Sequence, residues 1–311
     1  MRGLAFAYGP GIIPTMSAPR CALALTLLLL AACHATPVPV PTTPVGEPIT
    51  VPAGFDVEGH RGNRGNLFPG NTLPAYASAL AMGVDTIEAD MQISAEGQVF
   101  MGHDDDLGHT GCTWAGEGRA PSSKISRLKA AQIGQFDCHT QIDGIQPPPR
   151  LDTFLDAFFA AAGPETALNL ELKQRSNADA DVYLQALIAY DQGCDHCLRG
   201  RLILQSFQWS ALRYARANYG DAIEFRAAIL DKRGKLAEIE EARAYAEIWS
   251  PKHPLVTPEL LAEVQALDMQ AIPWTVNEPA RMRELITMGV DGIITDYPDL
   301  LLQLIGRAPT P

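Results

Sequence analysis

Two histidines, an arginine, a lysine and three carboxylates stand at the ends of short apolar segments of this chain. They belong to the stretches Gly59-His60-Arg61-Gly62, Glu88-Ala89-Asp90, Gly102-His103-Asp104 and Glu171-Leu172-Lys173. Carboxylate oxygens bind hard divalent cations, and imidazoles exchange protons near neutral pH. Together these groups could bind a metal ion and cleave a phosphate ester.

Three carboxylates are candidate metal ligands. Glu88 and Asp90 stand two apart on one predicted strand, so their side chains face the same way and can reach one ion. Two acids in an apolar strand are costly to bury without a cation, and the alternative is that they are solvated or ion-paired. Glu171 closes another apolar run. Because all-oxygen coordination favours Ca²⁺ or Mg²⁺ over zinc, we predict one divalent cation, Ca²⁺ or Mg²⁺, at these three residues.

The remaining groups suit proton transfer and phosphate binding. A histidine at a strand end is often structural, but two beside carboxylates indicate acid-base catalysis by His60 and His103. Which of them is the acid stays open. We expect Arg61 and Lys173 to hold phosphate oxygens, or alternatively to neutralise neighbouring carboxylates. Trp274 is a candidate contact for the carbon skeleton of the substrate, or else a core aromatic.

Apolar runs that end in polar residues alternate with helical patterns from residue 55 onward. The predicted strands are 55–59, 84–91, 99–102, 167–172, 201–206, 224–229, 247–250, 271–276 and 292–295. The predicted helices are 72–82, 152–162, 178–192, 210–219, 236–244, 258–267 and 279–288. This alternation indicates a parallel sheet with helices outside, and about 250 residues suit one closed α/β barrel. In such a barrel the charged strand ends meet at one mouth.

Nine predicted strands compete for the eight places of such a barrel. One of them must therefore be a loop, an extra hairpin strand or part of a neighbour. Residues 91–98 are too few for a helical crossover, and Ser94-Ala95-Glu96-Gly97 is typical of a turn. Residues 104–150 form an insertion too large for an ordinary loop, and we expect it to cover the barrel mouth.

The ordered motifs resemble those of the glycerophosphodiester phosphodiesterase family over nearly all of residues 55–305. They are Gly59-His60-Arg61-Gly62, Pro69-Gly70-Asn71-Thr72, Glu88-Ala89-Asp90, His103-Asp104, Glu171-Leu172-Lys173, Ser206-Phe207, Trp274-Thr275-Val276-Asn277 and Asp291-Gly292-Ile293-Ile294-Thr295-Asp296. A series of motifs in this order is far more specific than any one of them.

The resemblance implies a (β/α)8 TIM barrel with an insertion after the third strand. It also implies a metal bound at Glu88, Asp90 and Glu171, acid-base roles for His60 and His103, and hydrolysis of glycerophosphodiesters to glycerol 3-phosphate and an alcohol. Water could attack directly, or a glycerol hydroxyl could first form a cyclic phosphate. The alternatives are an enzyme similar to phosphatidylinositol-specific phospholipase C and an inactive phosphodiester-binding lipoprotein.

One position departs from the family pattern. The family usually has Pro-Glu-Asn-Thr where this chain has Pro69-Gly70-Asn71-Thr72, and the stretch from Gly62 to Pro69 is one residue longer than usual. Gly70 carries no carboxylate, so we expect either weaker metal binding or an altered substrate range.

The N-terminal segment has the pattern of an export signal. Residues 21–32 read CALALTLLLLAA, an apolar region too short for a membrane span, with Arg20 before it. Leu30-Ala31-Ala32-Cys33 resembles the bacterial lipoprotein processing site, so residues 1–32 are predicted to be a leader, with translation starting at Met1 or Met16. We expect lipidation at Cys33, or else an ordinary secretory leader cut near Ala35. The chain is thus expected to be periplasmic or in the cell envelope, lipid-anchored to a membrane.

Proline-rich residues 33–54 are predicted to be an extended tether, because closely spaced prolines exclude helix and sheet. The domain would then span residues 55–305.

Four cysteines follow Cys33. An even number in an exported chain favours disulfides, and local pairing of Cys112 with Cys138 and of Cys194 with Cys197 is the simplest of three connectivities. A zinc site that uses Cys194, His196 and Cys197 is the alternative, with no evident fourth ligand.

The net charge of the chain argues against nucleic acid as a partner. A formal net charge of −12 makes nucleic acid an improbable ligand, so an anionic small-molecule substrate must meet locally concentrated positive charge. A hydrophobic content of 47% is enough for a large core. The oligomeric state has no sequence signal.

Overall fold

The computed structural model describes residue 41 and residues 44–139, 142–173 and 176–307. The predicted leader, Cys33 and the first part of the predicted tether lie outside the described residues. In the part of the chain that the structure describes, no helix is long and apolar enough to cross a bilayer.

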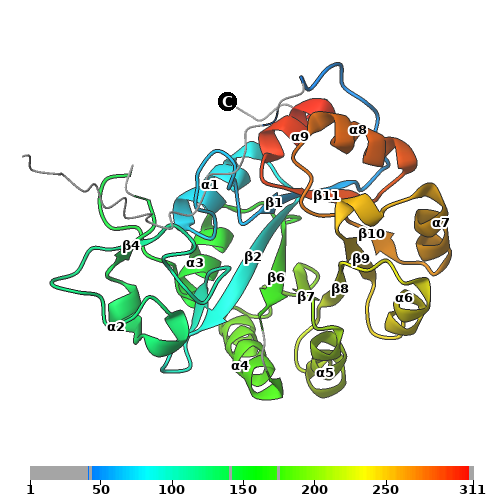
Figure 1. Cartoon of the computed structure of the whole chain (residues 1–311). Coiled ribbons are helices and arrows are strands. Elements are labelled where there is room, and N and C mark those ends of the chain that lie inside the picture. Colours follow the sequence, from blue (N-terminus) through cyan, green and yellow to red (C-terminus); the bar gives the residue numbers. More distant parts are fainter. Residues whose placement is uncertain (1–40, 42–43, 140–141, 174–175, 308–311) are drawn as a thin grey trace, which may run out of the picture. The chain divides into compact units, whose positions relative to one another are not determined.

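Eight parallel strands of the described chain form a nearly closed barrel surrounded by helices (Figure 1). Their order around the sheet is β10 (Gln270–Ala271), β9 (Ile248–Pro251), β8 (Arg226–Asp231), β7 (Leu202–Ser206), β6 (Ala167–Leu172), β2 (Thr86–Ile93), β1 (Asp56–His60) and β11 (Gly292–Thr295). The gap between β10 and β11 is bridged by hydrogen bonds, including Asp291 N to Ala271 O and Ile294 N to Pro273 O, both 3.0 Å. The predicted (β/α)8 TIM barrel is confirmed.

In the described part of the chain, seven helices connect successive barrel strands, and an eighth, α9, follows the last strand. The helices are α1 (Leu73–Met82), α3 (Leu151–Ala161), α4 (Asn177–Gly193), α5 (Trp209–Tyr219), α6 (Leu236–Ala242), α7 (Pro258–Ala266), α8 (Pro279–Met288) and α9 (Pro298–Leu304). Local signals set several of the ends. The Thr257 side chain accepts from Leu260 N at the start of α7, and Gly83 adopts φ 81° after α1. Helix α9 was missed by the sequence analysis, although Pro298 marks its first turn.

The ninth predicted strand is a hairpin partner. β3 (Val99–Met101) pairs antiparallel with β2, with Met91 opposite Met101, and a turn at Ser94 joins the two strands. The insertion thus follows the third strand of the chain, as predicted. β3 is not a barrel strand, however, so the insertion lies between the second and third strands of the barrel, β2 and β6.

The strand predicted over 271–276 is shorter in the structure. β10 ends at Ala271, because Pro273 has no N–H with which to continue a ladder. The carbonyl of Pro273 still accepts a hydrogen bond from Ile294 N, and Val276 N donates to Ile294 O at 3.0 Å. The segment therefore follows the barrel wall and carries Trp274 to its mouth.

The barrel interior has an apolar half and a polar half. Inward side chains of the apolar half form one cluster, made of Ile203, Ala228, Ile248, Ile272 and Ile294. The polar half is formed by β1, β2 and β6, in which every second residue points inward. These inward residues are polar, and they include Asp56, Glu58, Thr86, Glu88, Asn169 and Glu171. The period-two pattern of the strands thus places the acids inside the barrel. The larger core lies between the barrel and its helices.

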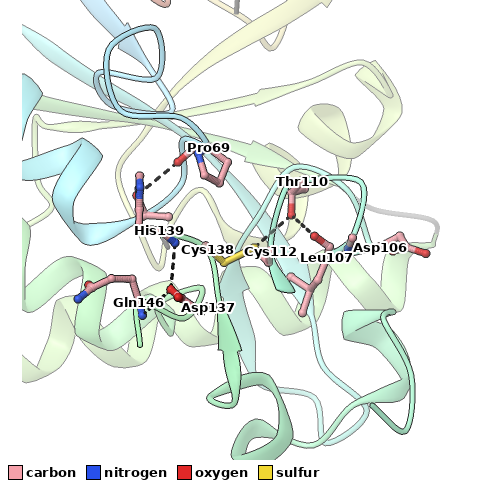
Figure 2. The surroundings of a disulfide bond; sticks show 11 residues. Pro69, Asp106, Leu107, Thr110, Cys112, Asp137, Cys138, His139 and Gln146 are labelled. Carbon is pink, nitrogen blue, oxygen red and sulfur yellow. Dashed lines mark hydrogen bonds between the residues drawn. A yellow bond between two sulfur atoms is a disulfide. The ribbon is translucent and has the colours of Figure 1, made fainter. Parts of the chain in front are cut away.

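The insertion has a small core of its own. It contains β4 (Thr113–Trp114) paired with β5 (Phe136–Asp137), the 3₁₀ helix η1 (Ile125–Arg127) and α2 (Ala130–Ile133). Figure 2 shows its disulfide between Cys112 and Cys138. A contact of 2.7 Å between His139 Nε2 and Thr72 Oγ1 joins the insertion to the loop before α1.

The described end of the predicted tether does not extend away from the barrel. Val45, Ile49 and Val51 pack against the main core, and Ile49 N donates to Leu304 O at 2.8 Å. Arg283 of α8 donates to the carbonyl of Val45. Apolar side chains between the prolines explain this docking, because burying them is favourable. From residue 45 onward, the described end of the predicted tether is thus packed on the domain.

The second cysteine pair closes a turn after α4. Cys194 and Cys197 form a disulfide, so their sulfurs are not available as the thiolate ligands of the alternative zinc site. Asp191 lies beside the pair, but its carboxylate accepts from Leu198 N at 2.9 Å and contacts His196 Nδ1 at 2.8 Å. These contacts stabilise a turn. A second 3₁₀ helix, η2 (His253–Leu255), follows β9.

Candidate active site

His60 lies at the carboxyl end of β1, beside the end of β11. Its Nδ1 is 2.6 Å from Asp296 Oδ1. Asn277 Nδ2 donates to the other carboxylate oxygen of Asp296 at 2.7 Å, and Arg64 Nη1 lies 3.1 Å from Oδ1. Asp296 is thus held from three sides, and it fixes the orientation of the His60 ring.

The protonation of this pair follows from its surroundings. Burial and the neighbouring Arg61 lower the pKa of His60 to about 4, although Asp296 acts in the opposite direction. Burial alone would raise the pKa of Asp296, but contacts with His60 and Arg64 hold that pKa well below its usual range. Both pKa shifts favour a neutral imidazole of His60 that donates its Nδ1–H to the ionised carboxylate of Asp296. The unprotonated Nε2 of His60 is then its basic atom, and it lies 3.9 Å from Glu88 Oε2.

The three predicted metal ligands converge. Glu88 and Asp90 lie on β2, and Glu171 lies on β6 directly opposite Asp90 in the register of the strands. One carboxylate oxygen from each residue lies within 4.8 Å of the others, and all three side chains are buried. The strand alternation brings Glu88 and Asp90 to one face, and the pairing of β2 with β6 supplies the third carboxylate.

The electrostatics of this cluster fit a cation. Burial, repulsion from Asp90 and, less strongly, from Glu171 raise the pKa of Glu88 well above its usual range. Burial raises the pKa of Glu171 to about 8 despite the nearby Lys173. Burial acts in the same direction on Asp90, but Lys173 and Arg61 hold its pKa well below the usual value. Three buried carboxylates with these shifts form a donor set of hard oxygens that suits a divalent cation.

Arg61 and Lys173 contact the acidic cluster directly. Arg61 Nε lies 3.0 Å from Asp90 Oδ2, and the Arg61 backbone N–H donates to Glu88 Oε2 at 2.9 Å. Lys173 Nζ lies 3.0 Å from Asp90 Oδ1 and 2.8 Å from Glu171 Oε2. These contacts show Arg61 and Lys173 neutralising the neighbouring carboxylates, which is the alternative role given for them above. A role in holding phosphate stays a prediction for both residues.

His103 follows β3 and lines a cavity that His60 also lines. Its Nδ1 lies 3.0 Å from Asp104 Oδ1, and its backbone carbonyl accepts from Gln92 Nε2 at 2.8 Å. The cavity measures about 130 Å³, and its walls include His60, Arg61, Glu88, His103, Glu171 and Trp274. Two imidazoles and two of the three metal-ligand candidates, Glu88 and Glu171, therefore line one space.

A larger cavity adjoins this one beneath the insertion. It measures about 470 Å³ and shares Arg61 and His103 with the smaller cavity. Its other walls include Arg64, Gly70 and the disulfide cysteine Cys112. The insertion therefore walls the approach to the site, as we expected from its position in the chain.

Trp274 is half-buried and lines the smaller cavity. Its indole Nε1 donates to Ser250 O at 2.8 Å, and its ring meets Phe207 edge to face with the centroids 5.3 Å apart. The two rings form an apolar wall of the smaller cavity. Trp274 also packs against the apolar cluster inside the barrel, so its contact with a substrate stays a prediction.

Four polar residues of the site were not predicted as site residues. Asn71 donates to Asp90 Oδ2 at 2.8 Å and accepts from Asp90 N at 3.0 Å, and Gln205 Nε2 donates to Glu88 Oε1 at 2.7 Å. Asp296 and Asn277 orient His60. Gln205, Asn277 and Asp296 lie at or just after a predicted strand, so the strand-end rule that found His60 would have found them too.

Gly70 allows a close approach of the loop to Arg61. A Cβ atom added at Gly70 would lie 2.5 Å from Arg61 Cβ and 2.7 Å from Arg61 O. The next residue, Asn71, donates its N–H to Arg61 O at 3.0 Å. A side chain at position 70 would therefore require this loop or Arg61 to shift.

The comparisons with known proteins agree with this geometry. The pattern of the Glycerophosphoryl diester phosphodiesterase family matches residues 60–300 of the chain. The chain belongs to this family. A glycerophosphodiester phosphodiesterase of Caldanaerobacter subterraneus is 27% identical over 251 residues, which are 80% of this chain and 96% of that protein. A glycerophosphodiester phosphodiesterase of Bacillus subtilis is 25% identical over 256 residues, 78% of this chain and 83% of that one.

Solved structures of glycerophosphodiester phosphodiesterases share the barrel. A putative member from Silicibacter pomeroyi has a TM-score of 0.71 at 25% identity and covers 86% of this chain and 98% of its own. A phosphodiesterase of Oleispira antarctica, solved with its product sn-glycerol-3-phosphate, has a TM-score of 0.68 at 21% identity and covers 82% and 97%. The predicted family and class of enzyme, a glycerophosphodiester phosphodiesterase, are confirmed.

Proposed function

We propose that this enzyme hydrolyses glycerophosphodiesters to glycerol 3-phosphate and an alcohol in a metal-dependent reaction with two catalytic histidines. The observation that carries the proposal is a cluster of three buried carboxylates, two of which line one cavity together with His60 and His103. Glu88, Asp90 and Glu171 would hold one divalent cation, Ca²⁺ or Mg²⁺. The bound cation would supply positive charge for the phosphoryl oxygens.

The two histidines divide the proton transfers. Burial and the nearby Arg61 favour neutral His60, so its Nε2 takes the proton of the attacking hydroxyl while Asp296 stabilises the resulting imidazolium. His103 donates a proton to the leaving alkoxide, and Asp104 orients it through Nδ1. The Arg61 guanidinium lines the cavity and holds a phosphoryl oxygen. Lys173 positions Asp90 and Glu171.

A metal-exchange assay tests the proposal. The purified enzyme should release glycerol 3-phosphate from glycerophosphocholine or glycerophosphoglycerol, lose activity in EDTA and regain it with Ca²⁺ or Mg²⁺. The same cations should raise the melting temperature of the wild type but not of Glu88→Gln or Glu171→Gln. Glu58→Gln is the matched control, because Glu58 is a buried glutamate of β1 outside the cluster. Activity that persists in EDTA would overturn the metal dependence.

Two products separate the open routes. Transient cyclic glycerophosphate would indicate attack by the neighbouring glycerol hydroxyl, whereas its absence in a quenched time course indicates direct attack by water. Release of cyclic inositol phosphate from phosphatidylinositol, without turnover of glycerophosphodiesters, would instead favour an activity similar to phosphatidylinositol-specific phospholipase C. Tight binding of diesters without any turnover would favour the inactive binding protein.

We also propose that the enzyme is exported and lipid-anchored through Cys33. The apolar leader with its lipoprotein-type end supports this, and so do the two disulfides, which persist in oxidising compartments. Palmitate labelling of the cells should mark the protein, and globomycin should block its processing. Cys33→Ser is expected to abolish the label, and labelling that survives this substitution would refute the anchor.

A further inference from the structure

We propose that Lys232 makes the enzyme select against diesters whose alcohol carries a positive charge, and favour neutral or anionic alcohols. The inference rests on the proposed function, and it concerns the substituent that leaves with the alcohol. Lys232 directly follows β8 and belongs to none of the family motifs quoted for this chain.

The Lys232 ammonium lies on the aromatic wall of the catalytic cavity. Its Nζ is 4.0 Å from the centroid of the Phe207 ring and 5.8 Å from that of Trp274. The two rings are in edge-to-face contact, and Phe207 is 37% exposed. All three residues line the cavity of about 130 Å³ that also contains His60 and His103. The cation is therefore part of the reaction site rather than of a distant surface.

The topology places this wall opposite the catalytic histidine. β8 and β1 are separated by β7, β6 and β2 in the order of the sheet, which is half of the eight-strand circuit. Lys232 at the end of β8 thus faces His60 and Arg61 across the mouth. A diester whose phosphorus lies between the two imidazoles must send one of its two substituents toward Phe207, Trp274 and Lys232.

The protein's own cation already occupies the aromatic face. Ring faces of Trp and Phe attract quaternary ammonium groups, and paired rings of this kind are a usual choline site. Lys232 already occupies the ring face of Phe207, so the ammonium group of a substrate would lie a few ångströms from a like charge. None of the ion pairs among the described residues includes Lys232, whereas its neighbour Arg233 pairs with Glu238. The Lys232 charge is thus available to an anionic or hydroxyl-bearing substituent.

A matched set of substrates isolates the charge. The set consists of glycerophosphocholine, its uncharged isostere with 3,3-dimethylbutanol and the anionic diester of 3-hydroxypropanoate. For the wild type with its metal, we expect kcat/KM for the isostere to exceed that for the choline ester about tenfold, the effect of one like charge at this range near a protein surface. The anionic diester should be at least as good as the isostere.

Variants assign the preference to Lys232. Lys232→Met should bring the ratio of isostere to choline ester close to one, and Lys232→Arg should keep it. Lys252→Met removes an exposed lysine that does not line the cavity, and it should leave the ratio unchanged. Melting curves of all variants check folding, and because Lys232 is exposed, we expect no loss of stability.

The outcomes separate this inference from the proposed function. A wild type that hydrolyses all three diesters with a ratio near one would overturn the inference and leave the function standing. An equal fall for all three diesters in Lys232→Met would overturn it too, because Lys232 would then hold the reacting phosphate. A wild type with no turnover of any diester would overturn the proposed function, and the inference with it.

Discussion

His60 Nδ1 and Asp296 Oδ1 lie 2.6 Å apart, although the two residues are separated by 236 positions in the sequence. The pairing of β1 with β11, with Gly59 opposite Thr295, joins the first and the last strand of the chain and creates this contact. A carboxylate in this position fixes the tautomer and the orientation of a catalytic imidazole. In the proposed mechanism, Asp296 is therefore the residue that would make His60 a defined base.

Asp296→Asn should reduce kcat about 10²-fold with little change in KM, because the amide cannot stabilise an imidazolium and permits the wrong tautomer. Steady-state kinetics on glycerophosphoglycerol measure both constants. Asp299→Asn, three residues further along, is the matched control and should retain wild-type kcat. A rise in KM alone would show that Asp296 binds substrate instead of positioning His60.

The acid and the base can be separated by the leaving group. His60→Ala and His103→Ala should each lower kcat on glycerophosphocholine by at least about 10²-fold. On a glycerophosphodiester of 4-nitrophenol, whose anion leaves without a proton, His103→Ala should regain most of its rate and His60→Ala should not. Rescue of His60→Ala instead would reverse the two assignments.

Restoring the family glutamate at position 70 should harm this enzyme. In Gly70→Glu the new side chain collides with Arg61 Cβ and Arg61 O, so the Arg61 guanidinium must move. Displacement of a positioned group by about 1 Å can cost about 10²-fold in rate, and we expect kcat/KM to fall by that order. Gly193→Glu is the control, since no atom lies within 4 Å of a Cβ there. A gain in activity or metal affinity would show that Gly70 replaces a functional carboxylate.

The two disulfides should differ in their contribution to stability. Cys112→Ser/Cys138→Ser opens a link across 26 residues, whereas Cys194→Ser/Cys197→Ser opens one across 3. In the chain-entropy account these losses lower the free energy of unfolding by about 3.5 and about 1.6 kcal/mol. Urea denaturation measures both. The first variant should also lose activity, because its disulfide lies in the wall of the larger cavity, and equal losses of stability would contradict the entropic account.

The buried carboxyl of Asp56 should make stability depend on pH. Burial raises its pKa to about 6, although Thr86 Oγ1 donates to it at 3.1 Å. A group with a raised pKa in the folded state contributes stability that is complete below its unfolded value of about 3.9 and is lost as the pH rises through about 6. The side chain in Asp56→Asn stays neutral at every pH. The melting temperature of this variant relative to that of the wild type should therefore rise from pH 4 to pH 7.

A pH series of melting temperatures tests this. Asp221→Asn, which changes an exposed carboxylate, should run parallel to the wild type across the series. If Asp56→Asn also runs parallel, then Asp56 is ionised at no cost in the folded protein.

The sequence by itself determined the class of fold, the succession of strands and helices along the chain and the set of chemical groups at the strand ends. Alternation within 86–93 places Glu88 and Asp90 on one face, and this signal is local, so it needs no knowledge of the fold. The series of motifs also sufficed to indicate the family. The extra strand at 99–101 and the break at Pro273 were harder, because pairing partners and closure depend on distant segments.

Only the tertiary structure decided which of these groups touch. The contacts of Asp296 with His60, of Arg61 and Lys173 with the acidic cluster, and of Lys232 with Phe207 join different strands of one closed sheet. A residue's place in the sequence tells which end of its strand it occupies, but the distance between two strand ends depends on the order of strands around the barrel. Closure sets that order, and with it the electrostatics of the site.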